Sequence, residues 1–367
     1  MLVNDLITSP LIDFFANQNY SAEVINGKKL IKKFDSTDQE LNSLYKGVGL
    51  RDISHEGILE LRGKDVLDFL HRIATNSTKD LPKAELTRTI FTNEKGRVID
   101  VASLFNFEDY QLLICSAENK LKVKSWIEKY TITDDVITAN VTGKYVVLEV
   151  IGPQSVSFLM LLCGSMINSL NENTFKVVHA EGLLFFLAKM KMLNGQTKFL
   201  IIADPENGKN IVKFMQENKG PFDFNLVGED AYNTYRIEQG IPGVPFELND
   251  TVNPHEVKIT EYIDFKKGCY IGQEVIARLE TYEKVQRYLM GVKFSSKPDD
   301  TEEILLVDEE GKDAGKVTSI TNSERLKNYI GLAFVRKFYA EEGKTLFAKS
   351  GSQQLISVQV SNLPFKK

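Results

Sequence analysis

Two stretches of the chain repeat one pattern, and this repeat constrains the fold more than any other feature. Residues 59–63 read Leu-Glu-Leu-Arg-Gly and residues 148–152 read Leu-Glu-Val-Ile-Gly. In both copies the glycine is followed by apolar residues three or four positions apart, which indicates a strand, a turn and a helix. The repeat predicts two related α+β halves, the second from about residue 145. Chance similarity between two strand–helix units is the alternative interpretation.

The later segments predict further helices and strands up to residue 239, then an irregular stretch, and from residue 285 only strands. The patterns predict a hairpin from residues 175–179 and 183–189, and helices over 207–218 and 229–239. Residues 240–257 hold three prolines and no clear period, which favours a loop that lines a site. From residue 285 the alternation of Tyr288, Met290, Val292 and Phe294 indicates a strand. Short strands separated by turns at 308–311, 342–343 and 350–351 then predict a small all-β domain.

Length and charge limit the functions that are possible. A chain of 367 residues exceeds the size that one core supports, so we expect a domain over 1–282 and a second over 283–367. The net charge of −5 offers no basic field for a nucleic-acid backbone. No apolar run approaches a membrane span. The amino terminus lacks the basic region of a signal peptide, which predicts a cytoplasmic location and no membrane partner.

The cysteines and histidines are few. Cys115, Cys163 and Cys269 are too scattered for a disulfide framework, and no C-x-x-C pair supplies the cysteines that usually hold an iron–sulfur cluster. The four histidines do not lie at metal-ligand spacing, so we expect no metal site.

Residues 267–274, Lys-Gly-Cys-Tyr-Ile-Gly-Gln-Glu, concentrate reactive side chains between two glycines. Glycine permits positive φ and close approach of the backbone, so this octet predicts a loop that presents side chains. Lys267, two residues from Cys269, is expected to favour the thiolate. The alternative is a tight turn in which a small cysteine is packed.

The octet resembles the K-G-C-Y-x-G-Q-E signature of the YgfZ-type folate-binding proteins. That family is implicated in iron–sulfur cluster assembly and repair and is paralogous to the aminomethyltransferase (T-protein) of the glycine cleavage system. The resemblance extends over nearly the whole chain from about Leu44. It implies an aminomethyltransferase-like folate-binding domain with two α+β halves, followed by a small C-terminal β-barrel. Further matching segments lie at residues 49–55, 75–77, 92–100, 236–242, 253–256, 315–319, 331–336 and 362–365.

Two departures separate the chain from the aminomethyltransferase branch. The adjacent aspartate pair of that branch is Asp100-Val101 here. Its G-Y-T-G-E segment, whose glutamate contacts the pterin, corresponds to residues 193–198, which contain no carboxylate. The octet instead belongs to the YgfZ branch.

The resemblance also implies site residues. Cys269 and Asp100 are the candidates for catalysis, with a hairpin position as the alternative for Asp100. The candidates for binding folate are Arg236, Lys267, Tyr270, Gln273, Glu274 and Arg278.

Each folate candidate has a structural alternative. The fork of the Arg236 guanidinium suits a carboxylate or a pterin oxygen, but an ion pair with Glu238 on the helix surface would also explain it. Lys267 and Arg278 suit the glutamate tail of folate or are solvated. Gln273 and Glu274 equally suit the first turn of a helix through Leu279, where Glu favours the helix dipole.

These inferences predict a tetrahydrofolate-binding accessory protein that supports iron–sulfur cluster assembly or repair in other enzymes. Its ligand would be tetrahydrofolate or a one-carbon derivative, and its partners would be iron–sulfur client or assembly proteins. The alternative is a folate-dependent, aminomethyltransferase-like one-carbon transferase. A purely structural scaffold is the third interpretation.

Overall fold

A computed structural model describes residues 6–16, 18, 20–282, 284–299, 303–350 and 355–366. Contacts within the chain group it into two units, which are described separately here. The first unit contains residues 1–69, 78–88 and 102–232, and the second contains residues 70–77, 89–101 and 233–367. The predicted boundary near residues 282–284 stays a prediction, and Glu283 lies outside the described residues. In the described part of the chain, no helix is both long enough and apolar enough to cross a membrane.

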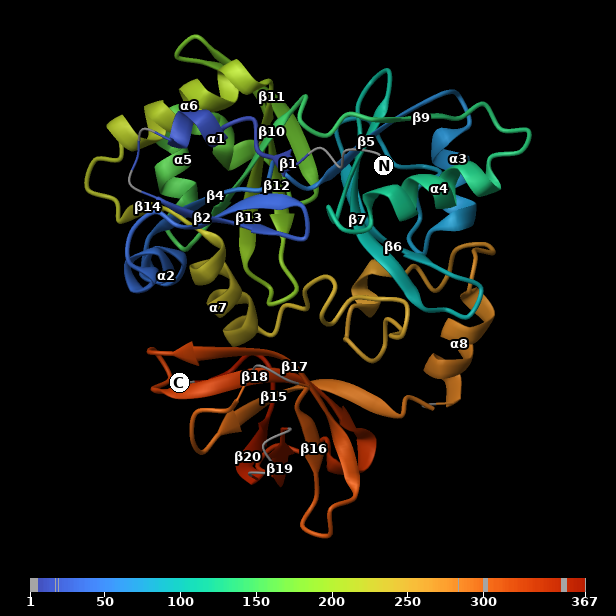
Figure 1. Ribbon diagram of the computed structural model, residues 1–367. Coiled ribbons are helices and arrows are strands. Elements are labelled where there is room, and N and C mark those ends of the chain that lie inside the picture. The colour runs from blue at the N-terminus through green and yellow to red at the C-terminus, as the bar shows by residue number, and fades with distance from the viewer. Residues whose placement is uncertain are drawn as a thin grey trace. The chain divides into compact units, whose positions relative to one another are not determined.

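The first repeat copy belongs to a five-stranded sheet with the strand order β6-β7-β8-β5-β9 (Figure 1). Its strand pairs are antiparallel where β5 meets β8 and β9, and where β7 meets β8. The elements are β5 (Gly57–Arg62), α3 (Val66–Ile73), β6 (Leu86–Thr92), β7 (Val98–Asn106), β8 (Gln111–Cys115), α4 (Lys120–Tyr130) and β9 (Ile137–Asn140).

The second copy belongs to a six-stranded sheet with the order β11-β12-β13-β10-β4-β14. Its β10-β13-β12-β11 part repeats the β5-β8-β7-β6 order of the first sheet, so the predicted pair of related halves is confirmed. The elements are β4 (Val48–Asp52), β10 (Val146–Ile151), α5 (Ser155–Cys163), η1 (Gly164–Ser169), β11 (Thr174–Ala180), β12 (Leu183–Lys191), β13 (Thr197–Ala203), α6 (Pro205–Glu217) and β14 (Phe224–Leu226).

The glycine that ends each repeat has the same backbone geometry in both halves. Gly63 has φ +126° and Gly152 has φ +127°. A Cβ added to Gly63 would lie 1.9 Å from the carbonyl oxygen of Asp135, and one added to Gly152 would lie 2.4 Å from that of Gly47. Both turns therefore require glycine for its backbone freedom and for the close approach of a neighbouring strand or loop.

The helix α6 begins two residues before the predicted start. Asp204 accepts hydrogen bonds from the backbone N–H groups of Glu206 and Asn207, and Pro205 occupies the first helical turn. An aspartate cap followed by proline is a strong start signal, because the capped N–H groups have no partner inside the helix.

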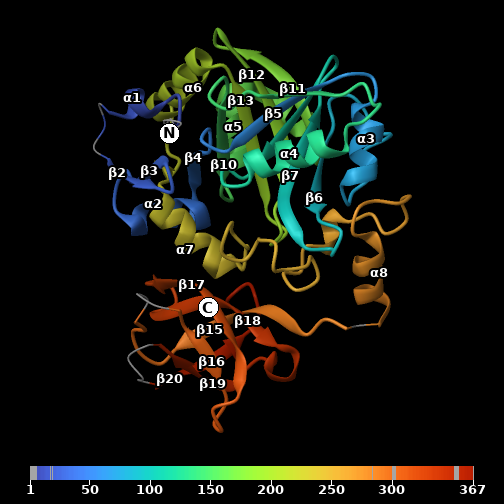
Figure 2. The same ribbon diagram turned by 45° about the vertical axis from the view of Figure 1, so that its right-hand side comes forward.

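Two apolar cores hold the first unit together. One lies between the two sheets and includes Phe105 and Leu112 of the first sheet with Ala188 and Ile202 of the second. The helices α5 and α6 lie against the second sheet (Figure 2). The other core lies between them and this sheet and includes Leu159 of α5. The second sheet is therefore covered on both faces, which explains why β10 is buried along its whole length.

A small additional sheet forms near the amino terminus of the first unit. Its order is β1-β3-β2, with β1 parallel and β2 antiparallel to β3. Its Lys28 side chain is buried among charged residues of the unit. The elements are β1 (Ile7–Thr8), α1 (Ile12–Phe15), β2 (Ser21–Ile25), β3 (Lys28–Lys33) and α2 (Thr37–Lys46).

The predicted helix over 229–239 is confirmed as α7 (Glu229–Gln239), and Gly240 after it has φ +69°. Residues 240–259 contain neither helix nor strand, as the prolines predicted. The short η2 (Thr260–Tyr262) and α8 (Gln273–Tyr282) follow.

The carboxyl-terminal strands close into a six-stranded barrel with the order β15-β18-β17-β16-β19-β20, in agreement with the predicted small all-β fold. Met290, Val292 and Phe294 share its core, as their alternation predicted. Of the predicted turns, the one at residues 350–351 includes Gly351, which lies outside the described residues. The elements are β15 (Arg287–Phe294), β16 (Leu305–Val307), β17 (Asp313–Ser323), β18 (Asn328–Arg336), η3 (Lys337–Tyr339), β19 (Thr345–Lys349) and β20 (Leu355–Ser361).

Candidate functional site

Lys267, the first residue of the octet, is buried, and its side chain reaches the carboxyl end of α3. Its Nζ donates hydrogen bonds to the carbonyl oxygens of Ala74 at 2.7 Å and Asn76 at 2.9 Å, and to that of His71. Burial lowers the pKa of Lys267 to about 8, although Asp264 opposes this. An ammonium has three donors, and here each has a carbonyl acceptor. In this structure the Lys267 side chain therefore stabilises the packing of the octet against the residues at the end of α3. Its predicted contact with folate stays a prediction.

The second half of the octet is anchored as well. Thr92 donates a hydrogen bond through Oγ1 to the Ile271 carbonyl oxygen at 2.7 Å. Gly272 has φ +85°, and a Cβ there would lie 2.6 Å from the carbonyl oxygen of Asn93. The buried Tyr270 ring lies 5.1 Å from the Nζ of Lys267, and burial raises the pKa of Tyr270 to about 12. The octet is thus a loop fixed at both ends.

Cys269 lies between these two anchors and is exposed. A Cβ added to the neighbouring Gly268 would meet nothing within 4 Å, so the space around this part of the loop is open. The loop therefore presents its thiol to solvent, which excludes the packed-cysteine alternative. The reactivity of that thiol stays a prediction.

The last three folate candidates, Gln273, Glu274 and Arg278, belong to α8. Gln273 is its first residue, and Glu274 lies in its first turn, where the helix alternative placed them. Arg278 forms an ion pair with Glu274 at 2.6 Å, one helical turn away, and both side chains are largely exposed. A surface pair of this kind contributes little to stability.

Arg236 is held in a buried polar network on α7. Its Nε donates to the Asn233 Oδ1 at 2.8 Å, its NH1 to the Glu247 Oε2 at 3.0 Å and its NH2 to the Ser319 Oγ at 2.9 Å. Glu247 is fully buried and also accepts hydrogen bonds from Thr318 and from the Gly243 N–H.

The alternative ion pair between Arg236 and Glu238 is wrong. Glu238 is fully buried and accepts hydrogen bonds from Ser323 and, at 2.8 Å, from Arg325. Residues two positions apart on a helix do not face each other, so Arg236 and Glu238 reach different partners.

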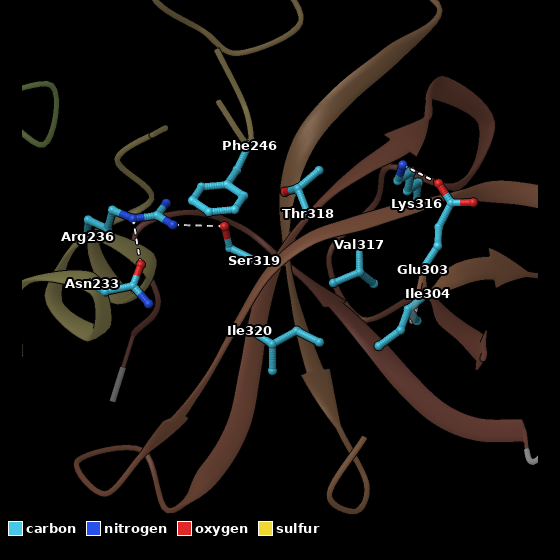
Figure 3. Close-up of a pocket in the computed structure, with 10 residues that line it drawn as sticks. All are labelled: Asn233, Arg236, Phe246, Glu303, Ile304, Lys316, Val317, Thr318, Ser319 and Ile320. Atoms are coloured by element: carbon cyan, nitrogen blue, oxygen red, sulfur yellow. Dashed lines mark hydrogen bonds and ion pairs between the residues drawn. The ribbon is translucent and has the colours of Figure 1, made fainter. Parts of the chain in front are cut away.

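A cavity of about 370 Å³ opens beside Arg236 in the second unit (Figure 3). Phe246 from the irregular segment forms part of its wall, and the Arg236 guanidinium lies 5.6 Å from the centre of that ring. The segment at 240–257 therefore contributes Phe246 to the wall of a cavity, and its role in a functional site stays a prediction. The cavity is lined by Asn233, Arg236, Phe246, Glu303, Ile304, Lys316, Val317, Thr318, Ser319 and Ile320.

Asp100 lies on β7 and is almost completely buried. It does not belong to the lining of the cavity beside Arg236. Its predicted role beside a pterin stays a prediction.

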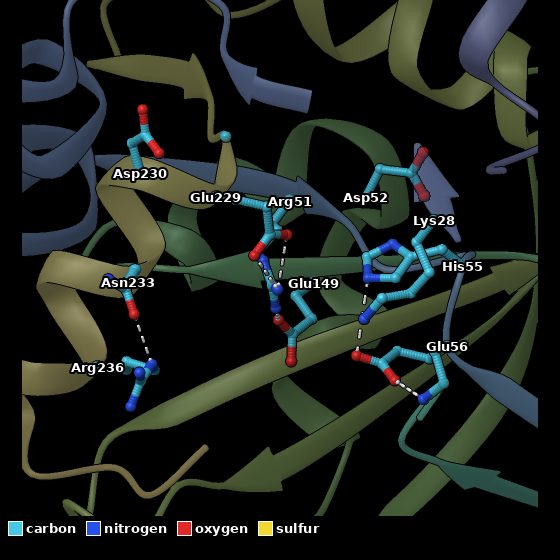
Figure 4. Close-up of polar contacts among 12 residues, drawn as sticks. Lys28, Arg51, Asp52, His55, Glu56, Glu149, Glu229, Asp230, Asn233 and Arg236 are labelled. Atoms are coloured by element: carbon cyan, nitrogen blue, oxygen red, sulfur yellow. Dashed lines mark hydrogen bonds and ion pairs between the residues drawn. The ribbon is translucent and has the colours of Figure 1, made fainter. Parts of the chain in front are cut away.

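Charged side chains also gather around Arg51 in the first unit, and the sequence did not predict this cluster. Arg51 donates to the Glu149 Oε2 at 3.0 Å and to the Glu229 Oε1 at 2.9 Å, and its guanidinium lies 3.7 Å from the centre of the Tyr232 ring (Figure 4). Burial alone would raise the pKa of Glu149, but the cations Lys198 and Arg51 outweigh it and hold that pKa at about 2.

Beside this cluster, Glu56 is three-quarters covered and accepts a hydrogen bond from the Ala117 N–H at 2.7 Å. Burial and the nearby Glu118 raise the pKa of Glu56 to about 8. Burial lowers the pKa of the neighbouring His55. In the described part of the chain, no three His, Cys, Asp or Glu side chains gather into a group that could hold a metal ion.

The sequence missed Glu247, Phe246 and the Arg51 cluster. The segment at 240–257 and the segment at 315–319 were both singled out, but nothing in the sequence showed that their side chains meet. Nothing in the sequence showed that Arg51, Glu149, Lys198 and Glu229 meet, because they lie in four distant segments.

The chain is similar to known proteins over almost its whole length. Residues 13–267 match the family model of the GCVT N-terminal domain, and residues 287–367 match that of the glycine cleavage T-protein C-terminal barrel domain. A putative chloroplastic transferase of Arabidopsis thaliana is 27% identical over 356 residues, which cover 96% of this chain and 79% of that protein. An aminomethyltransferase of Staphylococcus carnosus is 27% identical over 357 residues, which cover 96% of each.

A solved structure has the same architecture. The glycine cleavage system aminomethyltransferase T from Bartonella henselae matches with a TM-score of 0.85 over 98% of each chain, at 19% identity. At that identity the likeness shows the fold alone.

Proposed function

This chain belongs to the glycine cleavage T-protein family, and from that premise we propose that it binds tetrahydrofolate or a one-carbon derivative and supports iron–sulfur cluster assembly or repair in other enzymes. The observation that carries the proposal is the octet, which holds Cys269 exposed on a loop anchored at both ends. The resemblance of the octet to the K-G-C-Y-x-G-Q-E signature supports the YgfZ-type branch of the family within this proposal. A thiol presented in this way is open to a partner protein or a small electrophile.

The cavity beside Arg236 suits part of a folate. Its volume of about 370 Å³ falls in the range of small-molecule sites. Asn233 and Arg236 offer hydrogen-bond donors for the carboxylates of the glutamate tail, and Phe246 offers a ring for the benzoyl group. Val317 and Ile320 add an apolar wall. These residues fit the benzoylglutamate part, and the bound folate would supply the one-carbon chemistry.

Calorimetry with reduced tetrahydrofolate tests the binding. Phe246 is 53% exposed, so Phe246→Ala should weaken binding without unfolding the protein. Loss of one aromatic contact predicts about a tenfold larger Kd. The matched control is Phe338→Ala, because Phe338 is 83% exposed and lies outside the cavity lining. No binding by the folded wild-type protein would remove the centre of the proposal.

The supporting role is tested in cells that lack the protein. Restoration of iron–sulfur enzyme activities by the wild-type chain, and failure of Cys269→Ala to restore them, is the expected result. Full restoration by Cys269→Ala would contradict a role for the thiol and would favour a scaffold.

A second function is favoured by the relatives. The matching protein of Staphylococcus carnosus is named an aminomethyltransferase, and the match spans both chains almost completely. A folate-dependent transferase of this kind would need a carboxylate at the reacting nitrogen, for which the buried Asp100 is the candidate. Formation of methylenetetrahydrofolate from an aminomethyl donor, reduced about 10²–10⁴-fold by Asp100→Asn, would establish it over the accessory role.

The cytoplasmic location stays a prediction, and cell fractionation would test it.

A further inference from the structure

We propose that Lys267 is a positioning residue: it ties the octet loop to the carboxyl end of α3 and so fixes the place of the Cys269 thiol, rather than acting on the charge of that thiol. This inference rests on the proposed function, because it assigns a role to the thiol. It also replaces the expectation that a nearby lysine serves mainly to favour the thiolate.

The first step of the argument is the count of hydrogen bonds. The last carbonyl groups of a helix have no partner inside the helix. Lys267 donates to two carbonyl groups at the end of α3, those of His71 and Ala74, and to that of Asn76, which lies three residues beyond the helix. A cation at this end is also favoured by the helix dipole. All three N–H donors of the Lys267 ammonium therefore have backbone carbonyl acceptors.

The second step is the position of the two anchors. Lys267 lies two residues before Cys269, and the Ile271 carbonyl that accepts from Thr92 lies two residues after it. Each anchor joins the octet to backbone or side chains at residues 71–93, far away in sequence. Between the anchors, Gly268 and Cys269 are exposed. Two fixed points on either side of a free thiol restrict where that thiol can lie.

The third step concerns the rest of this contact region. Asp264 donates its N–H to the Thr75 carbonyl at 3.1 Å, and Thr75 donates through Oγ1 to the Tyr262 carbonyl at 2.8 Å. The segment before the octet is therefore also attached to the residues that follow α3. Loss of the Lys267 contacts would loosen the loop at one end while these bonds keep the segment in place.

Three variants separate the possible roles. Lys267→Met keeps the length of the side chain and removes every donor, whereas Lys267→Arg keeps a charged donor. Lys266→Met is the matched control, because Lys266 is the exposed lysine next in the chain. We expect amide hydrogen exchange at Gln273 and Ile276, whose N–H groups donate to the Tyr270 and Gly272 carbonyls, to become about tenfold faster or more in Lys267→Met. Exchange at Asp264 should stay unchanged, because its bond to Thr75 is kept. Exchange elsewhere, and exchange in the control, should not change.

A pH profile of alkylation distinguishes position from charge. If Lys267 positions the loop, the midpoint for alkylation of Cys269 is the same in the wild type and in Lys267→Met. A midpoint that moves to higher pH in Lys267→Met, with unchanged amide exchange, would overturn the proposal and assign Lys267 to the charge of the thiol.

Activity then links the position to function. We expect Lys267→Met to lower the unfolding midpoint, because three carbonyl groups lose their donor, and to lose support of iron–sulfur enzymes at temperatures where it stays folded. Lys267→Arg should recover part of that support. Full activity in Lys267→Met despite faster exchange would overturn the positioning role. If Cys269→Ala itself retained full activity, the proposed function would fail, and the exchange data would still decide whether Lys267 anchors the loop.

Discussion

Replacement of Glu56 by glutamine should make the first unit more stable near pH 8 and leave it almost unchanged near pH 5. The Glu56 side chain retains 25% of its surface, and burial together with Glu118 raises its pKa from 4.5 to about 8. The folded protein therefore keeps a proton on Glu56 over a range where the unfolded chain has released it. Stability from this group is present at low pH and is lost as pH rises through that range.

The size of the stability change follows from the interval between the unfolded and the folded pKa of Glu56. One pKa unit corresponds to about 1.4 kcal/mol, so the full range between 4.5 and 8 would carry up to about 5 kcal/mol. Partial exposure of Glu56 reduces this value by screening, and we expect about 2 kcal/mol between pH 5 and pH 8. Glutamine does not titrate, and its carbonyl can still accept the hydrogen bond from the Ala117 N–H.

Urea unfolding at a series of pH values measures the effect. Trp126 is the single tryptophan of the chain and lies on α4 in the first unit, so its fluorescence reports this unit. Burial lowers the pKa of His55, which makes stability rise with pH near its ordinary value. This opposite trend acts against the effect expected for Glu56. Because the His55 Nε2 lies 3.8 Å from the Glu56 Oε1, the sign of the difference between the two proteins, rather than its size, tests the role of Glu56.

The control is Glu108→Gln, since the Glu108 side chain is 78% exposed in the same unit. It should change the free energy of unfolding by less than about 0.5 kcal/mol at every pH. A difference between wild type and Glu56→Gln that stays constant from pH 5 to pH 8, or a variant that is less stable at pH 8, would refute the reasoning.

Three further predictions concern other parts of the molecule. Cys269 should be alkylated faster than Cys163, because Cys269 is exposed whereas burial raises the pKa of Cys163 to about 12; mass spectrometry of the labelled peptides would show equal slow rates if this is wrong. Gly152→Ala should cost about 1–3 kcal/mol more than Gly143→Ala in urea unfolding, because both have positive φ but only Gly152 lies against a carbonyl oxygen, and equal costs would contradict the steric argument. Arg51→Met should cost about 3–5 kcal/mol, since it leaves the buried Glu149 and the partly buried Glu229 without this cation, and a loss below about 1 kcal/mol in the same assay would contradict its structural role.

Local features were readable without coordinates. The repeated strand, glycine and helix led to the two related halves because the period of apolar residues and the need for glycine at a positive φ are properties of a few consecutive residues. The alternation from Tyr288 to Phe294 likewise led to a barrel strand. The octet with Cys269 stood out for the same reason, since its composition is unusual within eight positions.

The partners of the charged side chains depended on the folded chain. Lys267 meets carbonyl groups more than 190 positions away, and Arg236 pairs with Glu247 rather than with Glu238 beside it. Arg51 gathers its partners from two separate segments, β10 with Glu149 and α7 with Glu229. A charged side chain can be stabilised by many different opposite charges or dipoles. The packing of strands and helices decides which of these partners it contacts. The sequence therefore proposed candidate residues from local composition, whereas the packing of distant segments assigned each of them its contacts.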